Sequence, residues 1–230
     1  MYFISSDFHF SHNRVLEFER RKFKNLFEHN QAILDMLQHK LIDNRPKASD
    51  TFYFLGDFGM PRDDSQMKQL ETIFALTECR TVAILGNHDR KNPFREIITS
   101  LFDEVYEYPI YISNRLVLSH YPVPTLYNDE PSPVLNVHGH THASYIDGPN
   151  YLCASWAVAN YHCVSEKAVN NRLARLPEWN SKFLYEPFAK NYVFTPRVRD
   201  DIIYREDGSL DIEASREAVV RMRASTQKGE

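Results

Sequence analysis

The segment that decides the fold is TVAILGNHDR, residues 81–90, in which an apolar run ends in a polar turn. β-Branched and aliphatic residues fill its first half and predict a buried strand that stops at Gly86. In α/β proteins, ligands commonly bind just beyond the carboxyl ends of the strands. The side chains that follow the glycine, Asn87, His88 and Asp89, are therefore expected at a functional site.

Four other segments carry the same kinds of side chain where an apolar strand is expected to end. They are DFH at 7–9, GD at 56–57, SH at 119–120 and GHTH at 139–142. Together with Asn87 they supply enough carboxylate, imidazole and amide donors for two divalent metal ions. Nitrogen and oxygen donors without a thiolate favour Mn, Fe, Zn, Co or Ni over Ca, and Mn is the ion that we expect first.

Two of these segments carry candidate ligands two residues apart, Asp7 with His9 and His140 with His142. Residues at this spacing point to the same side of an extended chain. We therefore expect each pair to bind from an extended backbone. His138 precedes the glycine of its motif and is expected to lie behind the ligands rather than among them.

Several residues near these motifs have two interpretations. Asp57 is a candidate metal ligand or the N-cap of the next helix, although the helical pattern begins several residues later. His12 closely follows the DFH segment and is either part of the site or a surface histidine. The guanidinium groups of Arg14, Arg20 and Arg21 either bind a substrate phosphate or are solvated at the surface.

The order and spacing of DxH, GD, GNHD, a lone His after an apolar strand and GHTH resemble the calcineurin-like metallophosphoesterase superfamily. DFHFSHN and FLGDFG are similar to its small single-domain bacterial and phage-type members. The resemblance implies an α/β fold, a four-layer α/β/β/α sandwich of two mixed sheets with a binuclear metal site at the strand ends. The implied ligands are Asp7, His9 and His142 for the first ion, Asn87, His120 and His140 for the second, and Asp57 as the bridge.

The resemblance also implies the chemistry of a phosphohydrolase. A metal-bridging hydroxide would attack in line, and His88 would act as the general acid for the leaving alkoxide. Asp89 is expected to orient the His88 imidazole and raise its pKa. A phosphodiester is the expected substrate, because a poor alkoxide leaving group needs a proton. The alternatives are a phosphomonoesterase of the same family and a non-catalytic metal-binding scaffold for a partner protein.

Composition and charge limit the class of protein. The 230 residues, 43% of them hydrophobic and 25% charged, fit one soluble globular domain. No apolar run approaches the roughly 18 residues of a membrane span, and the first residues lack the basic start of a signal peptide, so a cytoplasmic protein without membrane contact is expected. A net charge of -4 and a pI near 6.2 disfavour long nucleic acids and leave a small phosphoester, such as a nucleotide, as the expected substrate.

Residues 1–176 are expected to form the metallophosphoesterase domain. Scattered aromatic residues and a charged helix or tail at 177–230 predict an arm packed on the same domain or on a second subunit of a homo-oligomer. The three cysteines form neither a disulfide framework nor a CxxC pair. Apolar periodicity predicts helices over 25–42, 63–76, 93–101 and 165–176, and strands over 2–6, 51–55, 81–85, 105–112, 116–118, 134–137 and 151–155.

Overall fold

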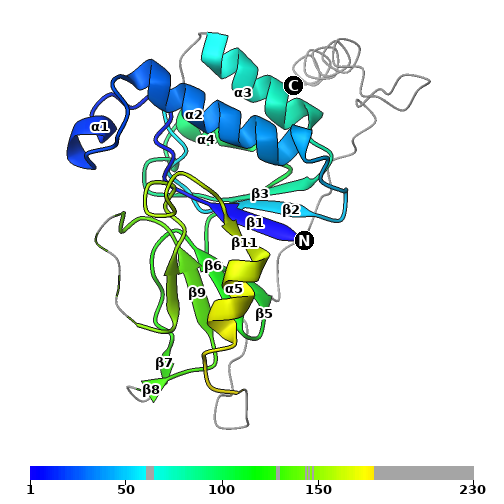
Figure 1. Cartoon of the computed structure of the whole chain (residues 1–230), viewed down its shortest axis with the longest axis vertical. Coiled ribbons are helices and arrows are strands. Elements are labelled where there is room, and N and C mark those ends of the chain that lie inside the picture. Colours follow the sequence, from blue (N-terminus) through cyan, green and yellow to red (C-terminus); the bar gives the residue numbers. More distant parts are fainter. Residues whose placement is uncertain (61–64, 128–129, 143, 145, 147, 179–230) are drawn as a thin grey trace.

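Two mixed β-sheets packed against each other form the centre of the protein, as Figure 1 shows. This computed structural model describes residues 1–60, 65–127, 130–142, 144, 146 and 148–178. The arm expected at 177–230 lies almost wholly outside the described residues. In spatial order, the five-stranded sheet consists of β11 (Val164–Ser165), β1 (Tyr2–Ser5), β2 (Thr51–Phe54), β3 (Arg80–Ile84) and β4 (Glu104–Tyr106).

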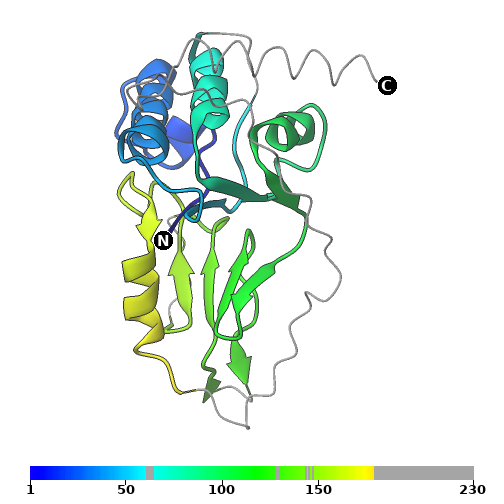
Figure 2. The same ribbon diagram turned by 90° about the vertical axis from the view of Figure 1, so that its right-hand side faces the viewer.

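The second sheet has four strands and lies on the opposite side from most of the helices (Figure 2). In spatial order, it consists of β10 (Tyr151–Cys153), β9 (Leu135–His138), β6 (Leu116–Ser119) and β5 (Ile110–Ser113). A separate two-stranded ribbon is formed by β7 (Leu126–Tyr127) and β8 (Glu130–Pro131).

The helices give the sandwich its outer layers. Figure 2 shows α2, α3 and α4 on one side of the five-stranded sheet, while α5 lies beside the second sheet. The bounds are α1 (Val15–Phe18), α2 (Leu26–Gln38) with its π-helical continuation η1 (His39–Asp43), α3 (Ser65–Leu76), α4 (Phe94–Leu101) and α5 (Glu166–Leu173). The mixed α/β sandwich expected from the sequence is thereby confirmed. None of the helices in the described part of the chain has the length and apolar character of a membrane span.

Alternation along the central strands explains why the five-stranded sheet is covered on both faces. In β2, Phe52 and Phe54 pack under the helices, whereas Tyr53 packs with the core between the sheets. In β1, Phe3 and Ile4 divide between the same two cores. Successive side chains of these strands thus alternate between the two faces of the sheet, and both faces are almost fully buried.

One of the predicted elements is wrong. The strand expected over 105–112 is split, because β4 pairs with β3 in the first sheet while β5 pairs with β6 in the second. Pro109 lies between the two pieces and has no N–H to donate to a sheet. Pro93 occupies the N-cap position of α4, and the Asn92 amide donates to Glu96 Oε1 at 2.7 Å.

The topology places the ends of several strands at one edge. β1, β2 and β3 run parallel to one another, and so do β6 and β9. Strands that run parallel end together, so the loops that follow them meet. Within the first of these loops, the fully buried Phe8 ring packs 4.7 Å from the Phe54 ring and 6.0 Å from the Trp156 ring, measured between centroids.

We expect Phe8→Ala to lower the free energy of unfolding by about 3–5 kcal/mol, because it leaves a cavity beneath the loop after β1. Urea denaturation followed by circular dichroism would measure the change. Phe27→Ala is the matched control, since the Phe27 side chain is 62% exposed. Equal effects of the two substitutions would contradict the role assigned to Phe8.

Candidate metal centre

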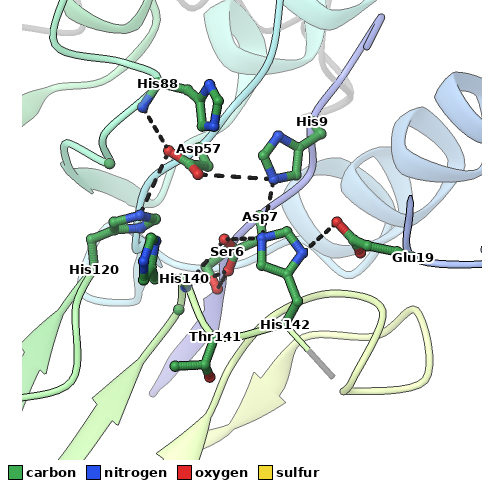
Figure 3. A network of polar contacts seen from close by, with 12 residues as sticks. Ser6, Asp7, His9, Glu19, Asp57, His88, His120, His140, Thr141 and His142 are labelled. Carbon is green, nitrogen blue, oxygen red and sulfur yellow. Dashed lines mark hydrogen bonds and ion pairs between the residues drawn. The ribbon is translucent and has the colours of Figure 1, made fainter. Parts of the chain in front are cut away.

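The loops after five strand ends bring the predicted ligands together. Each loop follows the carboxyl end of a strand, as the sequence predicts. Figure 3 shows the carboxylates and imidazoles of these loops pointing toward one another. The ligand candidates are Asp7 and His9 after β1, Asp57 after β2, Asn87 after β3, His120 after β6, and His140 and His142 after β9.

The first group of donors comprises Asp7, His9, Asp57 and His142, with one atom from each lying within 4.8 Å of the others. His142 Nε2 is 3.4 Å from Asp7 Oδ1 and 3.4 Å from His9 Nε2. Atoms bound to one ion at about 2.1 Å lie roughly 3 to 4 Å apart. The group therefore fits a single cation.

The second group comprises Asp57, His120 and His140, again within 4.8 Å. His120 Nε2 lies 3.6 Å from Asp57 Oδ1 and 3.0 Å from Asn87 Oδ1, which adds an amide oxygen at the same place. Asp57 belongs to both groups and lies between them in Figure 3. All the candidate ligands from the sequence are thus found around two adjacent positions.

The backbone of the ligand pairs differs from the expected extended chain. Asp7 and His9 have φ of 56° and 50°, and His140 and His142 have φ of 66° and 47°. The pairs converge because each ligand lies in a left-handed turn, not because of alternation along a strand. Backbone hydrogen bonds hold the first turn: Asp7 N donates to Gly56 O at 2.9 Å and His9 N to Asp57 O at 3.1 Å.

Glycines allow the loops to approach this closely. A Cβ on Gly86 would lie 2.1 Å from Asp57 Oδ1, and a Cβ on Gly139 would lie 2.6 Å from Asp7 Oδ2. Both contacts are far shorter than real carbon–oxygen contacts. The glycines that precede the ligands in the GN and GH motifs are therefore required by the site itself.

Comparison with known proteins agrees with this geometry. The sequence profile of calcineurin-like phosphoesterases matches residues 3–208. This chain belongs to the calcineurin-like phosphoesterase family. The uncharacterized protein MJ1445 of Methanocaldococcus jannaschii is 27% identical over 150 residues, which are 63% of this chain and 71% of that protein. The crystal structure of AQ665, a protein of unknown function from Aquifex aeolicus, is similar with a TM-score of 0.54 and 26% identity, over 74% of this chain and 98% of that chain.

Family and donor groups together indicate a metal-dependent phosphoesterase, a phosphoric ester hydrolase. The imidazoles of His9 and His120 are held in the neutral form that binds metal. Burial, followed by the nearby Arg21 guanidinium, holds the pKa of His9 well below its usual value, and burial lowers the pKa of His120 to about 4. His120 is also oriented by Leu55, whose carbonyl oxygen lies 2.7 Å from Nδ1. A neutral imidazole whose one ring nitrogen is held by a hydrogen bond presents its other ring nitrogen to a cation.

The carboxylates behave in the opposite way. Burial raises the pKa of Asp7 to about 7 and also raises the pKa of Asp57. Opposing contacts keep Asp7 from rising further: Ser6 Oγ donates to it at 2.6 Å and His140 N at 3.1 Å. A proton therefore competes with a metal ion for these oxygens near neutral pH.

His88 lies at the rim of the phosphoesterase site and is in neither donor group. His88 is exposed, and the centroid of its imidazole ring lies 5.5 Å from the centroid of the His9 ring. The backbone N–H of His88 donates to Asp57 Oδ1 at 3.0 Å, which fixes this turn on the shared carboxylate. His88 is thus placed beside both positions with a free imidazole, and its role as an acid stays a prediction.

Asp89 makes contacts other than the expected one with the His88 ring. Asp89 Oδ2 accepts from the backbone N–H of Asp57 at 2.6 Å and of Gly86 at 2.8 Å, and Oδ1 accepts from Phe58 N at 2.9 Å. None of the hydrogen bonds of Asp89 within the described residues reaches His88. Its carboxylate instead ties the loop after β2 to the loop after β3.

Two charged residues lie directly behind the site: Glu19, which the sequence analysis did not single out, and Arg21, for which it gave other roles. Glu19 contacts Nδ1 of His142, and Arg21 donates to the carbonyl oxygens of Asp7 at 2.8 Å and Phe8 at 2.7 Å. Arg21 is only 5% exposed, so neither of its two expected roles, phosphate binding or surface solvation, is correct. The only sequence signal is a charged cluster, EFERRK at 17–22, shortly after the DxH motif.

The remaining candidates lie outside both donor groups. His12 is half-buried, with its ring centroid 5.8 Å from that of His9 and 6.4 Å from that of His88, so it borders the site. His138 is buried and is a member of neither donor group. The exposed guanidinium of Arg14 packs on the Phe18 ring at 4.7 Å.

We expect Asp89→Asn to lower the free energy of unfolding at pH 8 by about 1–3 kcal/mol, because an amide cannot accept at both ends and leaves a buried backbone N–H unpaired. Urea denaturation would measure the loss. Asp35→Asn is the control, because Asp35 is exposed on α2. An unchanged unfolding free energy of Asp89→Asn would contradict the role of this carboxylate as a loop tie.

We also expect metal affinity to depend on pH. The pKa of Asp7 is about 7, so protons compete with the first ion below that pH and not above it. Lowering the pH from 8 to 6 should weaken the affinity for the first ion about tenfold, because the ionised fraction of Asp7 falls by about that factor between the two pH values. Calorimetric titration of metal-free protein would measure it, and equal affinity at pH 6 and pH 8 would contradict the proton competition.

Proposed function

We propose that this protein is a binuclear-metal phosphodiesterase. The observation that carries the proposal is that Asp57 belongs to both donor groups, so one carboxylate lies between two cation positions. A pair of divalent ions, when bound, lowers the pKa of a water molecule and offsets the charge of a phosphate during in-line attack. The chain supplies the donors that such a pair needs, including a shared anion that reduces the mutual repulsion of the ions.

The proposal keeps the ligand assignment made from the motifs. Mn is the preferred ion, with Fe, Zn, Co and Ni as alternatives, because the donors are nitrogen and oxygen atoms without thiolate. Asp57 bridges the two positions. The other ligands are Asp7, His9 and His142 for the first ion and Asn87, His120 and His140 for the second.

His88 is proposed as the general acid. Within the described residues its imidazole contacts the rings of His9 and His12 but makes no hydrogen bond or ion pair, which leaves its nitrogens available at the rim of the site. Its backbone is fixed on Asp57 by the hydrogen bond from its N–H. A proton held there is available to the leaving oxygen of a phosphoester whose phosphate lies on Asp57 and its neighbours. This supports a phosphoester with an alkoxide leaving group, which needs protonation; among these we propose a diester, although monoesterases would use the same acid.

A small phosphoester such as a nucleotide is the proposed substrate. Tyr121 supports it, because its 42% exposed side chain packs beside His140 with centroids 4.3 Å apart. An aromatic face next to the second donor group is suited to stacking on a base. A cytoplasmic location is also proposed, since all three cysteines are free thiols, as is usual in reducing compartments.

We expect the Mn-loaded protein to hydrolyse bis-4-nitrophenyl phosphate and to lose this activity in EDTA or on Asp57→Asn, because the shared ligand is removed. A screen of cyclic nucleotides, dinucleotides and phosphomonoesters would identify the substrate class. Turnover of monoesters alone would replace the diesterase by a monoesterase. No turnover of any phosphoester would favour the metal-binding scaffold.

His88→Ala gives a sharper test of the acid. We expect kcat to fall about 10²–10⁴-fold for a nucleotide diester with an alkoxide leaving group, and much less for bis-4-nitrophenyl phosphate, whose nitrophenolate leaves without a proton. Steady-state kinetics of both substrates would measure the difference. His162→Ala is the control, because His162 is exposed and outside both donor groups. Equal losses for the two substrates would contradict general acid catalysis by His88.

A further inference from the structure

Glu19 lies at the C-cap of the short helix α1 and uses both carboxylate oxygens. Oε1 contacts Nδ1 of His142, and Oε2 accepts from Arg21 through Nη2 at 2.8 Å and Nε at 2.9 Å. Figure 3 shows Glu19 on one side of the His142 ring and Asp7 on the other. The ring of His142 is therefore held between a carboxylate outside the donor groups and the first cation position.

This arrangement determines which nitrogen of His142 faces the cation. An imidazole that donates its Nδ1 hydrogen to a carboxylate presents the unprotonated Nε2 to a metal. His142 Nε2 is the atom that lies 3.4 Å from both Asp7 Oδ1 and His9 Nε2. The contact with Glu19 thus favours the tautomer and the ring orientation that metal binding needs.

Arg21 connects the same carboxylate to the other half of the first donor group. Its guanidinium donates to the carbonyl oxygens of Asp7 and Phe8, inside the left-handed turn that carries Asp7 and His9. His9 and His142 are 133 residues apart in sequence. A chain of contacts from His142 through Glu19 and Arg21 therefore joins two distant ligand loops.

We propose that Glu19 is a positioning residue that raises the affinity of the first ion and leaves the second ion unaffected. The selectivity follows from the contacts, because His120 in the second group is oriented by the Leu55 carbonyl and not by Glu19. The inference rests on the proposed metal site. A purely structural role in holding α1 would instead affect folding and both ions alike.

The experiment compares Glu19→Gln with the matched control Glu17→Gln, which removes the same charge from an exposed position on the same helix. Mn²⁺ is titrated into the metal-free full-length protein by calorimetry, and bound ions are counted by mass spectrometry. The wild type and Glu17→Gln should bind two ions. Glu19→Gln should bind one ion unchanged and the other about 10–100-fold more weakly, the usual effect of losing such a partner of a ligand. Equal weakening of both ions, or no weakening, would overturn the proposal.

Imidazole ¹⁵N spectra of the wild type at pH 8 test the orientation of the His142 ring directly. The measurement is made on the unsubstituted protein, and a substitution is needed only to assign the signal. The signal of His142, assigned by its loss in His142→Gln, should show a protonated Nδ1 and an unprotonated Nε2. A dominant Nε2–H tautomer in the metal-free protein would overturn the inference. If the wild type binds no ion in the calorimetric titration, the proposed function fails. The tautomer of His142 in the metal-free protein would still decide the role of Glu19.

Discussion

Close approach between loop backbones is the constraint on which the site depends. The loop that carries Asp57 lies so near the next loop that only a glycine fits at position 86. Five ligands, Asp7, His9, Asp57, His140 and His142, have a positive φ, at a cost of about 1–2 kcal/mol for each non-glycine residue. Such strain persists where the surroundings over-determine the conformation. Here the backbone bonds between the first two loops and the three bonds to Asp89 supply that restraint.

The sequence predicts where the ligands come from, because motif and strand end coincide at each of them. It predicts the central strands and long helices for the same reason, since apolar periodicity is strong there. Its failures are local. The extended form of the ligand pairs is wrong because hydrogen bonds between loops decide those dihedral angles, and no pattern within three residues records them. The single strand expected over 105–112 is wrong because two short strands of different sheets, β4 and β5, follow each other closely on either side of Pro109.

For a different reason, Glu19 was not predicted at the site and the contacts of Arg21 were not those predicted. Both residues lie after a four-residue helix with too few apolar positions for a period, and their partners are supplied by the tertiary fold. The two donor groups differ in this respect. His142 is oriented by a side chain, whereas His120 is oriented by the main-chain carbonyl of Leu55. A single substitution can remove the first contact, but no substitution removes a carbonyl. The first position is therefore the adjustable one of the pair.

The charge of the pocket bears on how the proposed metal ions and a phosphate would bind. Burial raises the pKa values of Asp7, Asp57 and Asp89, because an ionised carboxylate loses its solvation in this pocket. Arg21 is the one buried Lys or Arg in the described part of the chain, and its donors are used on carbonyl oxygens and Glu19. A phosphoester entering the metal-free pocket would meet uncompensated carboxylates in a medium of low dielectric, where repulsion is strong. In the proposed function, bound cations would offset this repulsion, and we therefore expect the ions to bind before the substrate.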